Sequence, residues 1–134
     1  MTNQPQPPIV PSLLRAGRGR RSHASGLQAE ALCCAALQRD GWDILGQRLR
    51  TASGEVDIAA SKNGLLAIVE VKSSASLTIA AHSLSARQMR RLIGAAEILI
   101  GENPDWGQAG MRFDLMLVDR AGMVRRVIDA FRLE

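Results

Sequence analysis

The chain has 134 residues, of which 46% are hydrophobic and 22% charged, a composition typical of one ordinary globular domain. Its formal net charge of +4 comes from residues 1–21, which contain four arginines and no acid, so residues 22–134 are electrically balanced. This distribution excludes a uniformly basic protein that wraps nucleic acid. A membrane span is also excluded, because no apolar run approaches the required length of roughly 20 residues.

Residues 1–21 hold four of the five prolines and no hydrophobic period, and we expect them to form a disordered basic arm. This arm would be either an electrostatic tether for phosphates or a solubilising tail. No secretory signal is recognisable, and the adjacent Cys33 and Cys34 favour a reducing, cytoplasmic location. The isolated His23 and His82 give no basis for a structural zinc site.

Residues 22–134 predict a single α/β domain with a mixed five-stranded sheet flanked by helices, in the order α-β-β-β-α-β-β. A first helix is predicted between a Ser25 cap and Gly41, and a second between a Ser85 cap and Gly101. A strand–helix–strand unit usually joins parallel strands through a right-handed crossover. The predicted helices cover residues 25–40 and 85–100, and the predicted strands cover residues 42–50, 55–60, 65–71, 112–118 and 123–131.

The dipeptide Asn63-Gly64 between two strand-like runs is a strong signal for a β-hairpin. If these are the two loop residues, Asp57 lies directly opposite Glu70, and Glu55 lies opposite Lys72. A four-residue loop would shift the pairing by two and keep the four side chains on one face. A three-residue loop would introduce a bulge and change the register.

Opposed carboxylates such as Asp57 and Glu70 destabilise a sheet, so either one is protonated or a cation lies between them. Two acids at that separation suit Mg²⁺ or Mn²⁺. Lys72 would then orient or deprotonate a water, or hold a phosphate oxygen, and Glu30 on the first helix could complete the metal shell. This set fits phosphodiester hydrolysis. The alternative is a surface ladder of ion pairs, Glu55 with Lys72 and Asp57 with a nearby arginine.

Three further cations, Arg87, Arg90 and Arg91, lie near the start of the second predicted helix, where they oppose the helix dipole. An anionic partner would offset this cost. The alternative is a solvated basic face.

The motifs Gly54-Glu55-Val56-Asp57 and Val69-Glu70-Val71-Lys72 are similar to the PD-(D/E)-x-K pattern of restriction-endonuclease-like folds. Over residues 26–131 the chain resembles the YraN-like family of bacterial proteins, regarded as predicted endonucleases that are distantly similar to archaeal Holliday-junction resolvases. The other positions that carry this resemblance are Gly26, Glu30, Leu37, Gly41, Ile44, Leu45, Arg50, Arg112, Phe113, Asp114, Ala130 and Phe131.

The resemblance implies a catalytic role for Glu30, Asp57, Glu70 and Lys72, with the three acids also binding the metal and Glu55 in support. It also implies that Arg50 and Arg112 are basic positions close to the site. Together with Arg87, Gln88 and Arg91 of the second predicted helix, they form the predicted nucleic-acid-binding set. The chain departs from the family pattern at Gln88, where Lys is usual, at Arg48, where Asn is usual, and at Ala29, where Gly is usual.

The sequence thus predicts an Mg²⁺- or Mn²⁺-dependent endonuclease acting on DNA, with branched or damaged structures among its substrates. A second interpretation is a non-catalytic nucleic-acid-binding or adaptor protein that retains the fold. A third is an interaction module that forms a homodimer through the loop of residues 73–84.

Overall fold

A computed structural model describes the backbone of residues 17–73 and 84–131, and the side chains from residue 26 onward within these ranges. The described residues confirm the predicted α/β class and the predicted order of elements. That order is α1 (Gly17–Arg39), β1 (Asp43–Thr51), β2 (Gly54–Lys62), β3 (Leu65–Ser73), α3 (Ala86–Glu102), β4 (Met111–Val118) and β5 (Val124–Phe131). The loop proposed for dimerisation lies almost wholly outside the described residues, so that interpretation stays a prediction.

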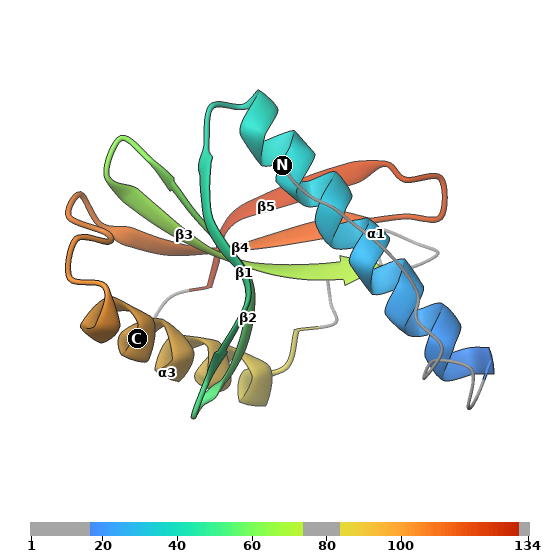
Figure 1. The fold of residues 1–134 in the computed structure, drawn as a ribbon, viewed down its shortest axis with the longest axis horizontal. Helices are drawn as coiled ribbons and strands as arrows, with labels where there is room; N and C mark the ends of the chain where they lie inside the picture. Colours follow the sequence, from blue (N-terminus) through green and yellow to red (C-terminus); the bar gives the residue numbers. More distant parts are fainter. Residues whose placement is uncertain (1–16, 74–83, 132–134) are drawn as a thin grey trace.

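The strands form one five-stranded mixed sheet in the order β1-β2-β3-β4-β5 (Figure 1). The pairs β1–β2, β2–β3 and β4–β5 are antiparallel, and β3–β4 is parallel. The parallel pair is the one that the predicted strand–helix–strand unit requires, with α3 in the connection. Neither helix in the described ranges has the length and apolarity needed to cross a membrane.

The two helices cover opposite faces of the sheet. On β3, Ala67 and Val69 pack in the cluster that contains α1 residues, whereas Leu66 and Ile68 pack in the cluster that contains α3 residues. Because neighbouring residues of a strand point to opposite faces, each helix has its own side of the sheet. The α3 side is filled from the helix by Leu92, Ala95, Ala96 and Leu99.

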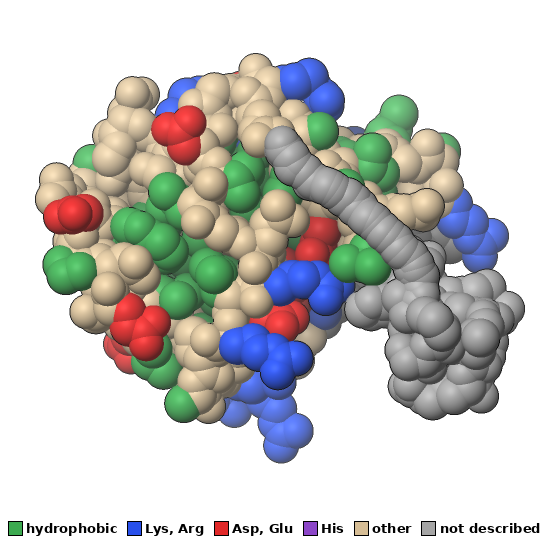
Figure 2. All heavy atoms as spheres, viewed as in Figure 1, with side chains coloured by type: hydrophobic (Ala, Val, Ile, Leu, Met, Phe, Trp, Pro, Cys, Tyr) green, Lys and Arg blue, Asp and Glu red, His purple; other side chains and the backbone are tan. Residues whose placement is uncertain are grey.

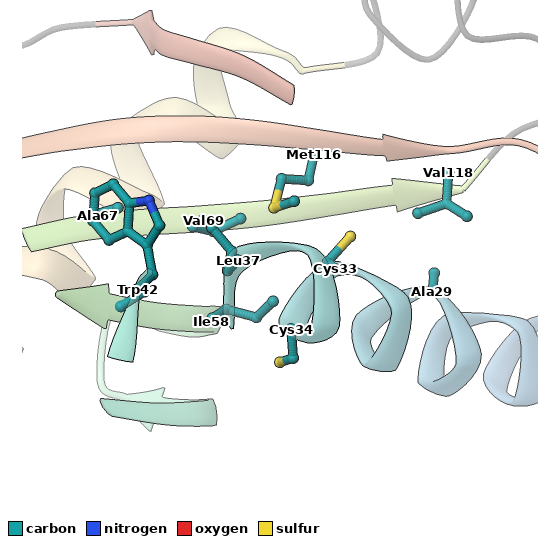
Figure 3. Close-up of a cluster of buried hydrophobic side chains, with 11 residues drawn as sticks. Ala29, Cys33, Cys34, Leu37, Trp42, Ile58, Ala67, Val69, Met116 and Val118 are labelled. Atoms are coloured by element: carbon teal, nitrogen blue, oxygen red, sulfur yellow. The ribbon is translucent and has the colours of Figure 1, made fainter. Parts of the chain in front are cut away.

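On the other face, α1 packs on the sheet through an apolar stripe formed by Ala29, Cys33, Cys34 and Leu37 (Figure 3). Cys33 and Leu37 are fully buried there, against Ile58, Val69 and Met116 among others. Both cysteines are free thiols. They therefore serve as small apolar core residues, as their place in a helix predicts.

The β2–β3 hairpin has the predicted two-residue turn. Its register pairs Ile58 with Val69 and Lys62 with Leu65, which leaves Asn63 and Gly64 as the loop. Both loop residues have positive φ, 53° and 83°, as a type I′ turn requires. The longer loops considered from the sequence are thereby excluded.

Two predicted helix boundaries were wrong. The first helix begins at Gly17 and not after a cap at Ser25, because Arg is a good helix former and no proline follows residue 11 before this point. Residues 1–16 of the predicted arm lie outside the described residues. The second helix continues through Gly101 to Glu102 and ends where Asn103 donates from its backbone and side-chain nitrogens to Leu99 O.

Candidate metal and phosphate site

The two acids predicted to oppose each other, Asp57 and Glu70, are in contact. The β2–β3 ladder ends at the pair Ile58 and Val69, and beyond it the Asp57 side chain takes over as the backbone partner of β3. The backbone N–H of Val71 donates to Asp57 Oδ2 at 2.8 Å. This bond holds the Asp57 carboxyl group beside Glu70, and the two carboxyl groups share a hydrogen bond.

Burial governs the protonation of this pair. It raises the pKa of Glu70 to about 7, and the charge of Asp57 adds to the rise while Lys72 opposes it. Burial also raises the pKa of Asp57, against the lowering effect of the hydrogen bonds from Val71 and Glu70. A shared proton therefore relieves the repulsion near neutral pH, which is the first of the two alternatives that the sequence left open.

Lys72 lies next to this pair, with its Nζ 3.6 Å from Glu70 Oε2 and its side chain 24% exposed. Glu55 has a different partner, Arg50, whose Nε lies 3.6 Å from Glu55 Oε2. The predicted surface ladder of Glu55 with Lys72 therefore does not form. The ammonium group of Lys72 is instead held at the carboxyl pair, with part of its surface open to a ligand.

Glu30 lies on α1 at the edge of the apolar stripe and is only 8% exposed. Burial raises its pKa, and the negative charges of Asp57 and Glu55 add to this rise. Its partner is Arg48 on β1, whose Nε donates to Glu30 Oε1 at 3.1 Å. Glu30 is thus close enough to Asp57 and Glu55 for their charges to act on it, but its own charge is balanced by the guanidinium group of Arg48.

The donor set fits Mg²⁺ through Asp57 and Glu70. In the part of the chain that the structure describes, no three His, Cys, Asp or Glu side chains are grouped to hold a metal ion. Mg²⁺ commonly binds through one or two carboxylates and keeps several waters, so two carboxyl groups in contact are compatible with this mode of binding. The structure therefore brings together three of the four predicted catalytic residues and leaves Glu30 bound to Arg48.

The contribution of Arg48 was missed because it depends on an irregular backbone. Arg48 has a φ of 51°, in the left-handed region that is uncommon for residues other than Gly and Asn. The same place disturbs β2, since Val56 packs on the α3 side and Ile58 on the α1 side although they are two residues apart. The one signal in the sequence was that Asn, which tolerates this conformation, is usual at this position in the family that the chain resembles.

The predicted nucleic-acid-binding residues Arg50, Arg87 and Arg91 are exposed, and Arg50 has 90% of its side chain in solvent. Arg91 lies over the β1–β2 turn, where Ser53 Oγ donates to its backbone oxygen at 3.3 Å. Figure 2 shows Lys and Arg side chains gathered around acidic ones in the area between α1 and the first turns of α3. A basic rim therefore adjoins the end of the sheet that carries the acids.

Gln88, also predicted to bind nucleic acid, has a structural role. Its side-chain oxygen accepts from the backbone N–H of Ser85 at 2.9 Å, and its own backbone N–H donates to Ser85 Oγ at 3.1 Å. These two bonds form a capping box at the start of α3. The Gln88 side chain thus accepts a hydrogen bond from the backbone N–H of Ser85, which a lysine could not do because its ammonium group has no acceptor.

Arg112 is separated from the acids, contrary to expectation. The parallel register places it beside Ala67, three residues before Glu70 along β3. Its Nε donates to Asp114 Oδ1 at 2.9 Å, and its guanidinium group stacks on Trp42 at 5.2 Å from the ring centre. Residues two apart in a strand share a face, so Arg112 forms its ion pair with the fully buried Asp114 and not with the acids of the candidate site.

Comparison with known proteins gives the family. The model of the uncharacterised protein family UPF0102 matches residues 29–118. This chain belongs to the UPF0102 family. A UPF0102 protein of Granulibacter bethesdensis is 53% identical over 117 residues, covering 87% of this chain and 74% of that protein. A second, from Azorhizobium caulinodans, is 41% identical over 131 residues, 98% of each chain, and a third, from Ruegeria pomeroyi, is 40% identical over 116 residues, 87% of this chain and 94% of that protein.

Membership confirms the family that the sequence resembles. The matched range includes the carboxyl cluster, which consists of Glu30, Glu55, Asp57 and Glu70. The names of these relatives assign no activity.

Proposed function

We propose that this protein is an Mg²⁺- or Mn²⁺-dependent endonuclease that hydrolyses phosphodiester bonds in DNA. The observation that carries the proposal is the contact between the partly buried carboxyl groups of Asp57 and Glu70, with Lys72 Nζ 3.6 Å from Glu70. Two partly buried acids in contact give a sheet no evident gain in stability, even when they share a proton. A divalent cation that replaces this proton and binds both carboxylates would give the pair a function.

In this proposal the two acids and the lysine have different tasks. Asp57, oriented by the Val71 N–H, and Glu70 would hold the metal ion, which when bound supplies charge neutralisation and polarises the phosphodiester group. Lys72 would orient the attacking water or hold a phosphate oxygen, and its positive charge opposes the negative charge that develops in the transition state. Glu70 must lose its proton for the pair to bind the cation.

The exposed Arg50, Arg87 and Arg91 support a polyanionic substrate, because they add positive potential beside the acids. Branched or damaged DNA is proposed as a substrate on the resemblance to resolvases. A cytoplasmic location is part of the same proposal, since DNA is present there and the free thiols of Cys33 and Cys34 would stay reduced.

The test is cleavage of duplex, branched and single-stranded DNA in the presence and absence of Mg²⁺ or Mn²⁺. We expect metal-dependent products from the wild type and loss of cleavage in Asp57→Ala and Lys72→Ala. Arg39→Gln removes an exposed charge from the C-terminal end of α1 and serves as the matched control. Cleavage that survives both site substitutions would refute the proposal.

The second candidate is a nucleic-acid-binding or adaptor protein without turnover. The observation that favours it is the neutralisation of Glu30 by Arg48, which removes one predicted acid from the metal shell. This candidate predicts salt-sensitive DNA binding that persists in Asp57→Ala, with no products at any metal concentration. Metal-dependent nicking by the wild type decides against it.

A further inference from the structure

Arg48 is placed at the carboxyl cluster by the pairing of β1 with β2. Its neighbours Gln47 and Leu49 pair with Ile58 and Val56, so Arg48 occupies the position on β1 between these pairs, as Asp57 does on β2. Glu30, the partner of Arg48, is also close enough to Asp57 for the charge of Asp57 to raise its pKa. Arg48 is therefore next to the proposed metal site.

The conformation of Arg48 is unfavourable unless something holds it. A φ of 51° lies in the left-handed region, which is disfavoured for a residue with a Cβ atom. The bond from Nε to the buried Glu30 carboxylate supplies a compensating interaction, because charge-assisted hydrogen bonds are strong when partly shielded from water. Strain that the surroundings maintain is characteristic of functional positions.

Glu30 engages the inner nitrogen of Arg48. Nε carries the hydrogen bond that the described residues show for this side chain, and 38% of the Arg48 side chain is exposed. A guanidinium group has five N–H donors in a planar fork, so four remain on the terminal nitrogens. A phosphate group presents paired oxygens that match two of these donors.

We propose that Arg48 binds a backbone phosphate of the nucleic acid at this site and that Glu30 is its positioning residue. This inference rests on the proposed function and changes one of its assignments, because Glu30 acts through Arg48 and not as a metal ligand. The ligand chemistry is a phosphodiester oxygen beside the Asp57–Glu70 pair. Arg48 thus joins Lys72 as a cation that flanks the substrate.

Two other roles for Arg48 make different predictions. If Arg48 competes with the metal ion for Glu30, its removal frees a carboxylate and metal affinity rises. If Arg48 is only structural, its removal lowers stability and leaves both metal and DNA affinity unchanged in the folded protein. Binding measurements on the full chain separate these roles from phosphate binding.

The first measurement is the affinity for a fluorescent duplex oligonucleotide in EDTA, where cleavage cannot interfere, as a function of salt. We expect Arg48→Gln to weaken binding about tenfold, the loss of one charged hydrogen-bonded contact. The slope of log affinity against log salt should become shallower by about 0.9, the value for one phosphate contact. Arg48→Lys should keep the slope and lose affinity, since an ammonium group cannot bond Glu30 and a phosphate with one fork.

The second measurement is Mn²⁺ binding without DNA, by electron paramagnetic resonance. We expect Arg48→Gln and Glu30→Gln to bind Mn²⁺ like the wild type, and Asp57→Ala to lose it. Glu30→Gln keeps an oxygen that accepts from Arg48, so it also guards against simple unfolding. Arg39→Gln is the charge-matched control in both measurements.

Unchanged duplex affinity in Arg48→Gln would overturn the inference. A rise in the Mn²⁺ affinity of Arg48→Gln would also overturn it, and so would a tenfold loss of Mn²⁺ affinity in Glu30→Gln. A wild type that binds no Mn²⁺ would defeat the proposed function alone, because the duplex measurement still judges Arg48. A wild type that binds no duplex would defeat the phosphate contact.

Discussion

The carboxyl pair predicts that stability and metal binding oppose each other at Glu70. Glu70→Gln is nearly isosteric and has no charge at any pH, so it removes the repulsion with Asp57 while filling the same space. The pKa of Glu70 rises from an ordinary 4.5 to about 7 in the folded protein, which at about 1.4 kcal/mol per pKa unit corresponds to roughly 3 kcal/mol. The side chain is only 16% exposed, so solvent screening takes little from this figure.

The sign follows from the direction of the shift. Folding favours the protonated form of Glu70, so this contribution to stability is fully present below about pH 4.5 and is lost as the pH rises through about 7. We therefore expect the free energy of unfolding of Glu70→Gln, minus that of the wild type, to increase by roughly 3 kcal/mol between pH 4.5 and 8.

The assay is urea unfolding in EDTA at a series of pH values, followed by circular dichroism. Taking the difference between two proteins cancels the titration of shared groups that do not interact with Glu70, whereas the changed titration of Asp57 is part of the measured difference. Glu97→Gln, which changes an exposed carboxylate of α3, is the matched control and should follow the wild type at every pH. A difference between Glu70→Gln and the wild type that stays flat over this range would refute the assignment of a shared proton.

A bound metal ion should stabilise the wild type and not Glu70→Gln. At a hundred times its dissociation constant, Mg²⁺ or Mn²⁺ should add about 2.7 kcal/mol to the stability of the wild type. It should leave Glu70→Gln unchanged, because that variant lacks one of the two carboxylates. Equal stabilisation of both proteins would show that the metal binds elsewhere.

Three further changes test the structure around the site. Asp114→Ala leaves Arg112 as an unpaired, largely buried charge and should cost about 3–5 kcal/mol in urea unfolding, while Mn²⁺ affinity in the folded protein is retained. Gln88→Ala removes the side-chain half of the capping box and should lower stability by about 0.5–1 kcal/mol; no change in the urea midpoint would contradict the cap. Gly64→Ala meets both a φ of +83° and the Ala109 methyl group 3.1 Å away, so the same measurement should show a loss of at least about 1 kcal/mol.

The carboxyl pair could be predicted from the sequence because the β2–β3 hairpin has strong local signals. Asn63-Gly64 selects a two-residue turn, and a two-residue turn sets the register of the strands that follow it. Once the register is known, Asp57 and Glu70 must meet. The apolar stripe of α1 and the Ser85 cap of α3 were predictable for the same reason, since each depends on residues close together in the chain.

The remainder of the site depends on contacts between distant residues. Nothing in the period-two pattern of β1 indicates that Arg48 adopts a left-handed conformation and reaches Glu30 on α1, eighteen residues earlier. Arg112 was misplaced because its distance from the acids depends on the parallel register of β4 on β3. No local signal sets that register, since α3 and a long connection separate the two strands.

The irregularity that β1 and β2 share at Arg48 and Asp57 is used by the candidate site and not by the packing of the core. Val56 lies on the α3 face, and Ile58, Ala59 and Ala60 then alternate between the α1 and α3 faces. Deleting Asp57 together with Arg48 would give β2 an unbroken alternation and leave Val56 facing Leu49 and Ile58 facing Gln47. The deletion would remove one irregularity of the β1–β2 pairing, and the register shift between Ile44 and Gly46 would stay. The core residues of β2 would keep their faces, so this scaffold can lose Asp57 without losing its packing.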